Sequence, residues 1–178
     1  MVNPEIEGDV LVGANTRCGP GVRLLAGTIG RIIIGQRCNF KSGVVIACYG
    51  GTVTIGNRVS IGEYTVIYGH GGVTIGDAVA IAPHCAISSQ EHIVGSHIAL
   101  RFSGERLAET RIECGAIVSA HCVVTAGIRI GARTLVGAGS VVTDSLPAGV
   151  VAFGTPCKIR ERIRENPLYG LDDTCDIG

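Results

Sequence analysis

The side chains best suited to chemistry lie in one irregular stretch. From Ser88 to Glu109 the sequence reads "SSQEHIVGSHIALRFSGERLAE", which contains two of the five histidines, His92 and His97. An imidazole changes its charge near neutral pH, so it can accept a proton from a hydroxyl group or bind a metal ion. Glu91 could orient the ring of His92, or could be a solvated loop carboxylate. The elements that hold this stretch limit which chemistry is possible.

The composition favours thin, repeated β layers. A chain of 178 residues is long enough for one domain with a full core. Hydrophobic residues make up 46%, yet aromatic residues make up only 4%, and there are 27 glycines. A core poor in rings must be built from small and β-branched side chains, which suit short strands. The formal net charge of zero argues against a nucleic-acid-binding protein.

Neither export nor membrane insertion is indicated. The longest apolar runs are about five residues, whereas a transmembrane helix needs about 20. The first residues, "MVNPEIEGDV", lack the basic and apolar regions of a signal peptide, so we expect a cytoplasmic protein. The eight cysteines contain no CxxC pair, and several fall inside the repeat described next, where they would act as small apolar filler. We expect no metal cofactor.

A period of six residues runs through most of the chain. Aliphatic or similar residues recur as Val12, Cys18 and Leu24; Ile34, Phe40 and Ile46; Ile55, Ile61 and Ile67; Ile75, Ile81 and Ile87; and then Ile112, Val118, Val124, Ile130, Val136 and Val142. Between the first five triplets the spacing widens to ten, nine, eight and 25 residues. Insertions therefore follow only a third unit.

This pattern predicts a β-solenoid. Each unit is a short strand and a turn, three units form one triangular coil, and the insertions leave from one corner. Six coils at the spacing of paired strands give a prism about 30 Å tall. We expect an all-β domain over residues 1–156 with an excursion loop at 88–111, and a short C-terminal helix and tail over 157–178. An ordinary β-sandwich would not explain the constant register.

The sequence resembles the hexapeptide-repeat acyltransferases over roughly residues 30 to 165. The resemblance is strongest in "AGIRIGARTLVGAGSVVTDSLPAGVVAFGTPCKIRERI", which is similar to the terminal signature of the sugar O-acetyltransferase and xenobiotic acetyltransferase branch. It implies a left-handed parallel β-helix and acetyl-CoA as cosubstrate. It also implies a homotrimer with active sites between subunits.

The resemblance also implies the catalytic residue. The branch carries a catalytic histidine at the start of its extended loop, which corresponds to His92, with His97 as a rival in the same loop. The imidazole would accept the proton of the acceptor hydroxyl as its oxygen attacks the thioester carbonyl, while backbone N–H groups stabilise the oxyanion. The thiolate of CoA leaves readily, so no covalent enzyme intermediate is required.

Residues for binding acetyl-CoA follow from the same resemblance. Small residues beside the groove between subunits correspond to Ser119 and Ala138, and Thr143 lies towards the adenine end. Basic residues at the exit from the helix correspond to Lys158 and Arg160, which would meet the 3′-phosphate. The alternative for these two is a solvated face of the expected C-terminal helix.

Two departures leave the acceptor open. Many relatives have Trp-Ile-Gly where this chain has "AIVS" at 116–119, and a lysine where it has Asp144. We expect O-acetylation of a sugar or polysaccharide precursor in polysaccharide biosynthesis. The alternatives are N-acetylation of an amino sugar, acetylation of a xenobiotic, and a non-catalytic scaffold. A γ-type carbonic anhydrase, in which His92 and His97 would bind a metal, is more remote. We expect a small-molecule or sugar partner, no nucleic acid and no membrane span.

The other histidines are expected to have ordinary roles. His84 and His121 fall inside six-residue units, where a side chain usually faces solvent or a partner subunit. His70 belongs to the short insertion "YGHGG" and is expected in a turn.

Overall fold

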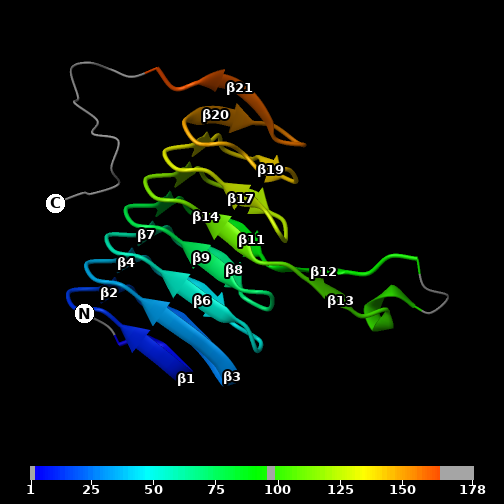
Figure 1. Ribbon diagram of the computed structural model, residues 1–178. Coiled ribbons are helices and arrows are strands. Elements are labelled where there is room, and N and C mark those ends of the chain that lie inside the picture. The colour runs from blue at the N-terminus through cyan, green and yellow to red at the C-terminus, as the bar shows by residue number, and fades with distance from the viewer. Residues whose placement is uncertain (1–2, 96–98, 165–178) are drawn as a thin grey trace.

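The computed structural model describes residues 3–95 and 99–164 and confirms the predicted fold class. The chain winds into a parallel β-solenoid of about six coils that stack along one axis (Figure 1). A two-stranded arm projects sideways from the stack. No α-helix occurs among the described residues, and no helix there is long and apolar enough to cross a membrane.

The strands line three faces of the prism. The first face contains β2 (Arg17–Cys18), β4 (Asn39–Phe40), β7 (Ser60–Ile61), β10 (Ala80–Ile81), β15 (Ile117–Val118), β18 (Leu135–Val136), β20 (Val150–Phe153) and β21 (Lys158–Arg162). The second contains β5 (Val45–Ala47), β8 (Val66–Tyr68), β11 (Ala86–Ser88), β16 (Val123–Val124) and β19 (Val141–Val142). The third contains β6 (Thr52–Ile55), β9 (Val73–Ile75), β14 (Thr110–Ile112) and β17 (Arg129–Ile130). β1 (Glu5–Val12) and β3 (Arg23–Ile34) cross from the second face to the third.

The register between coils matches the six-residue period. On the third face, for example, Ile55 pairs with Ile75, which pairs with Ile112 across the long insertion. From Leu24 onward these inward residues are almost fully buried, because each points into the prism and stacks on its counterpart one coil away. The predicted triplets are therefore the core of the molecule.

The corners of the prism use left-handed backbone. Tyr64, His84 and His121 occupy equivalent positions in successive coils with φ near +60°. Their rings form a column: Tyr64 lies 5.5 Å from His84, and His84 lies 5.0 Å from His121 between ring centroids. All three side chains are exposed, as expected for the two histidines.

The arm leaves the corner between the second and third faces. β12 (Gln90–His92) follows β11 after one residue and pairs antiparallel with β13 (Glu105–Leu107), and a 3-10 helix (Leu100–Phe102) lies between them. The arm lies within the stretch 88–111 where the excursion was expected, while Ser88, Thr110 and Arg111 belong to the solenoid strands β11 and β14 (Thr110–Ile112).

The short C-terminal helix predicted from residue 157 is wrong for the residues described. Lys158–Arg162 forms β21, which pairs antiparallel with β20. The last coil leaves the backbone of β20 at an open sheet edge, and a returning strand satisfies its hydrogen-bonding groups. A helix of so few residues has little stability of its own. Residues 165–178 lie outside the described part of the chain.

Candidate active site

His92 is the last residue of β12 on the arm, four residues after the end of β11 at Ser88. Its strand pairs Gln90 with Leu107, Glu91 with Arg106, and His92 with Glu105. Successive side chains of a strand alternate between its faces. Gln90, His92, Glu105 and Leu107 therefore share one face of the arm, and Glu91 and Arg106 share the other.

Glu105 is the cross-strand neighbour of His92. Backbone hydrogen bonds join Ile93 to Gly104 at 3.1 Å and Ala108 to Ser89 at 3.0 Å. In an antiparallel pair such bonds alternate, so the His92–Glu105 pair is of the kind without direct hydrogen bonds, in which side chains approach most closely. The arm thus pairs a histidine with a glutamate across its two strands.

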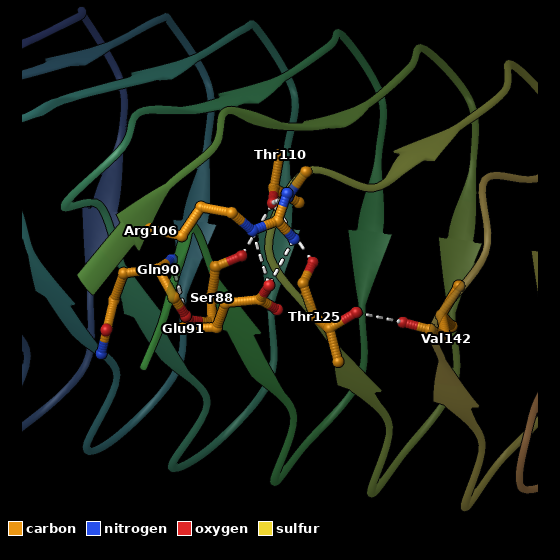
Figure 2. Close-up of polar contacts among 8 residues, drawn as sticks. Ser88, Gln90, Glu91, Arg106, Thr110, Thr125 and Val142 are labelled. Atoms are coloured by element: carbon orange, nitrogen blue, oxygen red, sulfur yellow. Dashed lines mark hydrogen bonds and ion pairs between the residues drawn. The ribbon is translucent and has the colours of Figure 1, made fainter. Parts of the chain in front are cut away.

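The opposite face of the arm contains an ion pair. The guanidinium of Arg106 donates hydrogen bonds to the carboxylate of Glu91 through Nε, at 2.7 Å, and through a terminal nitrogen (Figure 2). Glu91 is therefore engaged with Arg106 on the face away from His92. The orienting role predicted for Glu91 stays a prediction.

Thr110 ties the base of the arm to the solenoid. Its buried hydroxyl lies 2.7 Å from the carbonyl oxygen of Ser88 and 3.3 Å from that of Thr125 (Figure 2). The backbone N–H of Gly127 donates to the same hydroxyl at 3.2 Å. One side chain thus connects the strand before the arm, the strand after it and the next coil.

A hollow of about 530 Å³ opens at the base of the arm on the third face. Its lining consists of Gly51, Thr52, Thr54, His70, Gly71, Gly72, Thr74, Leu107 and Glu109. Leu107 comes from the arm face that carries His92. The guanidinium of Arg111 and the hydroxyl of Thr74 lower the pKa of Glu109, so this carboxylate stays charged at neutral pH.

The residues expected to bind acetyl-CoA lie on the upper coils in two groups. Thr143 is exposed after β19. The carboxylate of its neighbour Asp144 forms an ion pair with Nζ of Lys158 at 3.0 Å. Arg160 lies over the ring of Phe153, 4.7 Å from its centroid. Lys158 therefore lies beside Asp144, the residue after Thr143, and Arg160 lies beside Phe153.

The other two residues of this set lie near the corner formed by the first and second faces. Ser119 follows β15 and its N–H bonds to Val136, while Ala138 is exposed two residues after Val136 in the next coil. Phe153 packs beside Gly137, so the Arg160–Phe153 pair belongs to this end of the coil.

Two curated proteins match most of the chain. A galactoside O-acetyltransferase of Escherichia coli (strain K12) is 36% identical over 122 residues, covering 68% of this chain and 59% of that protein. A galactoside O-acetyltransferase of Lactococcus lactis subsp. lactis (strain IL1403) is 30% identical over 140 residues, covering 78% of this chain and 67% of that protein. The chain belongs to the hexapeptide-repeat acyltransferase family.

A solved structure supports the same fold. A variant of the N-acyltransferase AntD from Bacillus cereus, in complex with dTDP-4-amino-4,6-dideoxyglucose and coenzyme A, superposes with a TM-score of 0.73. It is 21% identical and covers 86% of this chain and 83% of that chain, a likeness that shows the left-handed β-helix of the family. No known protein-family profile matches the sequence.

Two further points concern His97 and a metal site. His97, the rival to His92 within this acyltransferase, lies outside the described residues. Over residues 3–95 and 99–164, no group of three or more His, Cys, Asp or Glu side chains is placed to hold a metal ion.

Sequence reasoning missed Glu105 and the lining of the hollow. The pairing of His92 with Glu105 depends on where the arm turns, and no repeat fixes that position. The threonines of the hollow had a signal: Thr52, Thr54 and Thr74 alternate with buried residues on strands, which predicts an outward polar row.

Proposed function

We propose that this protein transfers an acetyl group from acetyl-CoA to a hydroxyl group of a sugar. The observation that carries the proposal is the arm, which holds His92 on the same face as Leu107, beside the hollow at the arm's base. Two relatives named galactoside O-acetyltransferase support the reaction class, and the AntD complex with coenzyme A supports the cosubstrate.

In the proposed mechanism His92 is the general base. Its neutral imidazole accepts the proton of the acceptor hydroxyl while the oxygen attacks the thioester carbonyl. The C–S bond of the tetrahedral intermediate then breaks, and the thiolate of CoA takes the proton from the imidazolium. The products are the acetyl ester and CoA, with no covalent enzyme intermediate.

We propose Glu105 as the positioning residue for His92. The register pairs Glu105 with His92 across the arm. A carboxylate that turns towards the ring from this position can accept a hydrogen bond from it and stabilise the imidazolium. The geometry favours Glu105 for the orienting role that the sequence suggested for Glu91, whose carboxylate binds Arg106.

We propose that acetyl-CoA binds along the upper coils. Ser119 and Ala138 offer small side chains at one corner, so an extended chain could approach the backbone there. Thr143 and Lys158 form the other group. The ammonium group of Lys158 can bind a phosphate once it leaves the carboxylate of Asp144. Arg160, which lies over the ring of Phe153, is proposed as a second residue that binds phosphate.

We also propose that the protein forms a homotrimer. The tip of the arm exposes Ile93, Val94, Leu100 and Phe102, whose exposed fractions run from 47% to 80%. A cluster of apolar side chains on a projecting element is suited to burial against another subunit. We propose that the reaction takes place in the cytoplasm, where acetyl-CoA is available.

N-acetylation of an amino sugar is the second candidate. It is favoured by the AntD complex, whose sugar carries an amino group. The same base and thioester would serve both acceptors, so the geometry alone does not separate them.

Product analysis tests the proposal. The purified protein is incubated with acetyl-CoA and methyl β-galactopyranoside, methyl β-glucopyranoside or the corresponding 4-amino-4-deoxy sugar. Mass spectrometry is expected to detect a monoacetylated neutral sugar whose acetyl group is lost in mild base, as an ester requires. A base-stable amide formed only on the amino sugar would establish the second candidate. Absence of acetylation on every sugar would contradict both.

A further inference from the structure

Two of the four tyrosines gather at the corner from which the arm leaves. The ring of Tyr49 stacks on His70 with centroids 4.4 Å apart and planes at 20°, and Tyr68 lies 6.1 Å from Tyr49. The exposed fractions of Tyr49 and Tyr68 are 63% and 38%. The described core contains one ring, that of Phe40, so these aromatics are not needed for packing.

The stack borders the hollow at the base of the arm. His70 belongs to its lining, which continues with the outward hydroxyls of Thr52, Thr54 and Thr74 and ends at Glu109. The hollow therefore offers the flat ring of His70, which Tyr49 supports by stacking, together with the hydrogen-bonding groups of the threonines. Sugar rings need both, because they present a face of C–H groups and an edge of hydroxyl groups.

Two buried polar atoms beside the hollow have no partner. Within the described residues, Nδ1 of His70 and Oε1 of Gln90 make no hydrogen bond. Gln90 pairs with Leu107, a residue of the lining, and lies on the arm face of His92. Buried polar groups are normally satisfied, so each atom calls for a partner that the described residues do not supply.

The charge of the lining selects among ligands. Glu109 is its only charged residue, and this carboxylate is already paired with Arg111 at 2.7 Å. No cation faces the hollow among its lining residues, so a phosphate or a nucleotide would lose its hydration without gaining a partner. A neutral sugar fits this balance.

We propose that the hollow beside the Tyr49–His70 stack is the acceptor site and that it binds a neutral hexopyranoside. This inference rests on the proposed function, because a sugar bound in the hollow is an acceptor only if the protein transfers acetyl groups. The hollow of about 530 Å³ lies within the size range of small-ligand sites. His92 stands two residues along the strand from Gln90, about 7 Å, so a sugar that protrudes from the hollow reaches the base.

The chain offers a matched control. Tyr64 stacks on His84 with centroids 5.5 Å apart and planes at 18°, also at a corner with left-handed backbone. Neither residue lines the hollow, whereas His70 does and Tyr49 stacks on it. Tyr49→Ala and His70→Ala can therefore be compared with Tyr64→Ala and His84→Ala, which remove equivalent stacks elsewhere.

Steady-state kinetics and direct binding test the site together. Tyr49→Ala and His70→Ala are expected to raise KM for methyl β-galactopyranoside or methyl β-glucopyranoside about tenfold. His70→Ala removes the ring that lines the hollow, and Tyr49→Ala removes the ring that holds it in place. KM for acetyl-CoA is expected to stay unchanged, and both control variants are expected to match the parent. Saturation-transfer NMR with the same glycosides, without acetyl-CoA, is expected to show binding to the parent and its loss in the two site variants.

The outcomes separate this inference from the proposed function. If the parent binds a glycoside at the hollow but transfers no acetyl group, the site stands and the proposed function falls. If transfer occurs and the site variants keep the sugar KM of the control variants, the hollow is not the acceptor site. If the parent binds neither methyl glycoside, the carbohydrate assignment is overturned.

Discussion

At the scale of single residues, the face on which a side chain lies determines its role. The antiparallel register separates His92 and Glu105 from Glu91 and Arg106, although all four lie within a few residues of one another on the arm. The ion pair between Glu91 and Arg106 joins the two strands of the arm on its other face. The face of His92 and Glu105 also carries Leu107, which lines the hollow.

Glu105→Gln tests the positioning role. The amide keeps the size of the side chain but loses the charge that stabilises the imidazolium, so kcat is expected to fall about tenfold with both KM values unchanged. Glu105→Asp is expected to recover part of the loss, which a purely structural role would not require. Steady-state kinetics on Glu91→Gln give the comparison. An equal or larger fall in kcat for that variant would return the role to Glu91.

At the scale of elements, the arm works only if the solenoid holds both of its ends. The β11 strand before the arm and the β14 strand after it belong to different faces, and Thr110 bridges them from inside the corner. Thr134 makes an equivalent bond to Pro147 at 2.7 Å in a coil without an arm. Thr110 is therefore the repeat's ordinary corner residue, used here to anchor the arm.

Thr110→Val is expected to affect both stability and activity. Valine fills the same space but removes the hydroxyl that donates to the carbonyl of Ser88, at a cost of about 1 to 3 kcal/mol. The N–H of Gly127 keeps its second acceptor, the carbonyl oxygen of Ala108. Thr134→Val is expected to lower the thermal midpoint by a similar amount. Acetyl transfer below that midpoint should fall only in Thr110→Val, measured at one temperature for both. Equal activity of the two variants would show that Thr110 does not position the arm.

At the scale of the whole molecule, the repeat explains why the fold was predictable. Each aliphatic residue of the period stacks on its counterpart in the next coil, so one rule fixes every register, including the Ile75–Ile112 pair across the long insertion. The exit to β21 was not predictable in the same way. Lys158–Arg162 has no period, and its conformation depends on the open edge of β20.

The site was predictable only where it touches the repeat. The interruption after Ile87 located the arm, and the family resemblance singled out His92. The partners of His92 depend on the antiparallel pairing within the arm, which carries no repeat. Tyr49 and His70 lie 21 residues apart in the chain and meet because two coils stack. Such contacts follow from the register and not from any local motif.

The rate of acetyl transfer by three histidine variants tests the central claim most directly. Transfer of radiolabelled acetyl from acetyl-CoA to the sugar acceptor is measured for the parent, His92→Ala, His97→Ala and His84→Ala. Loss of the general base is expected to lower kcat about 100-fold or more in His92→Ala, with His84→Ala equal to the parent. Parent-like transfer by His92→Ala, or a loss confined to His97→Ala, would contradict the assignment of His92 as the base.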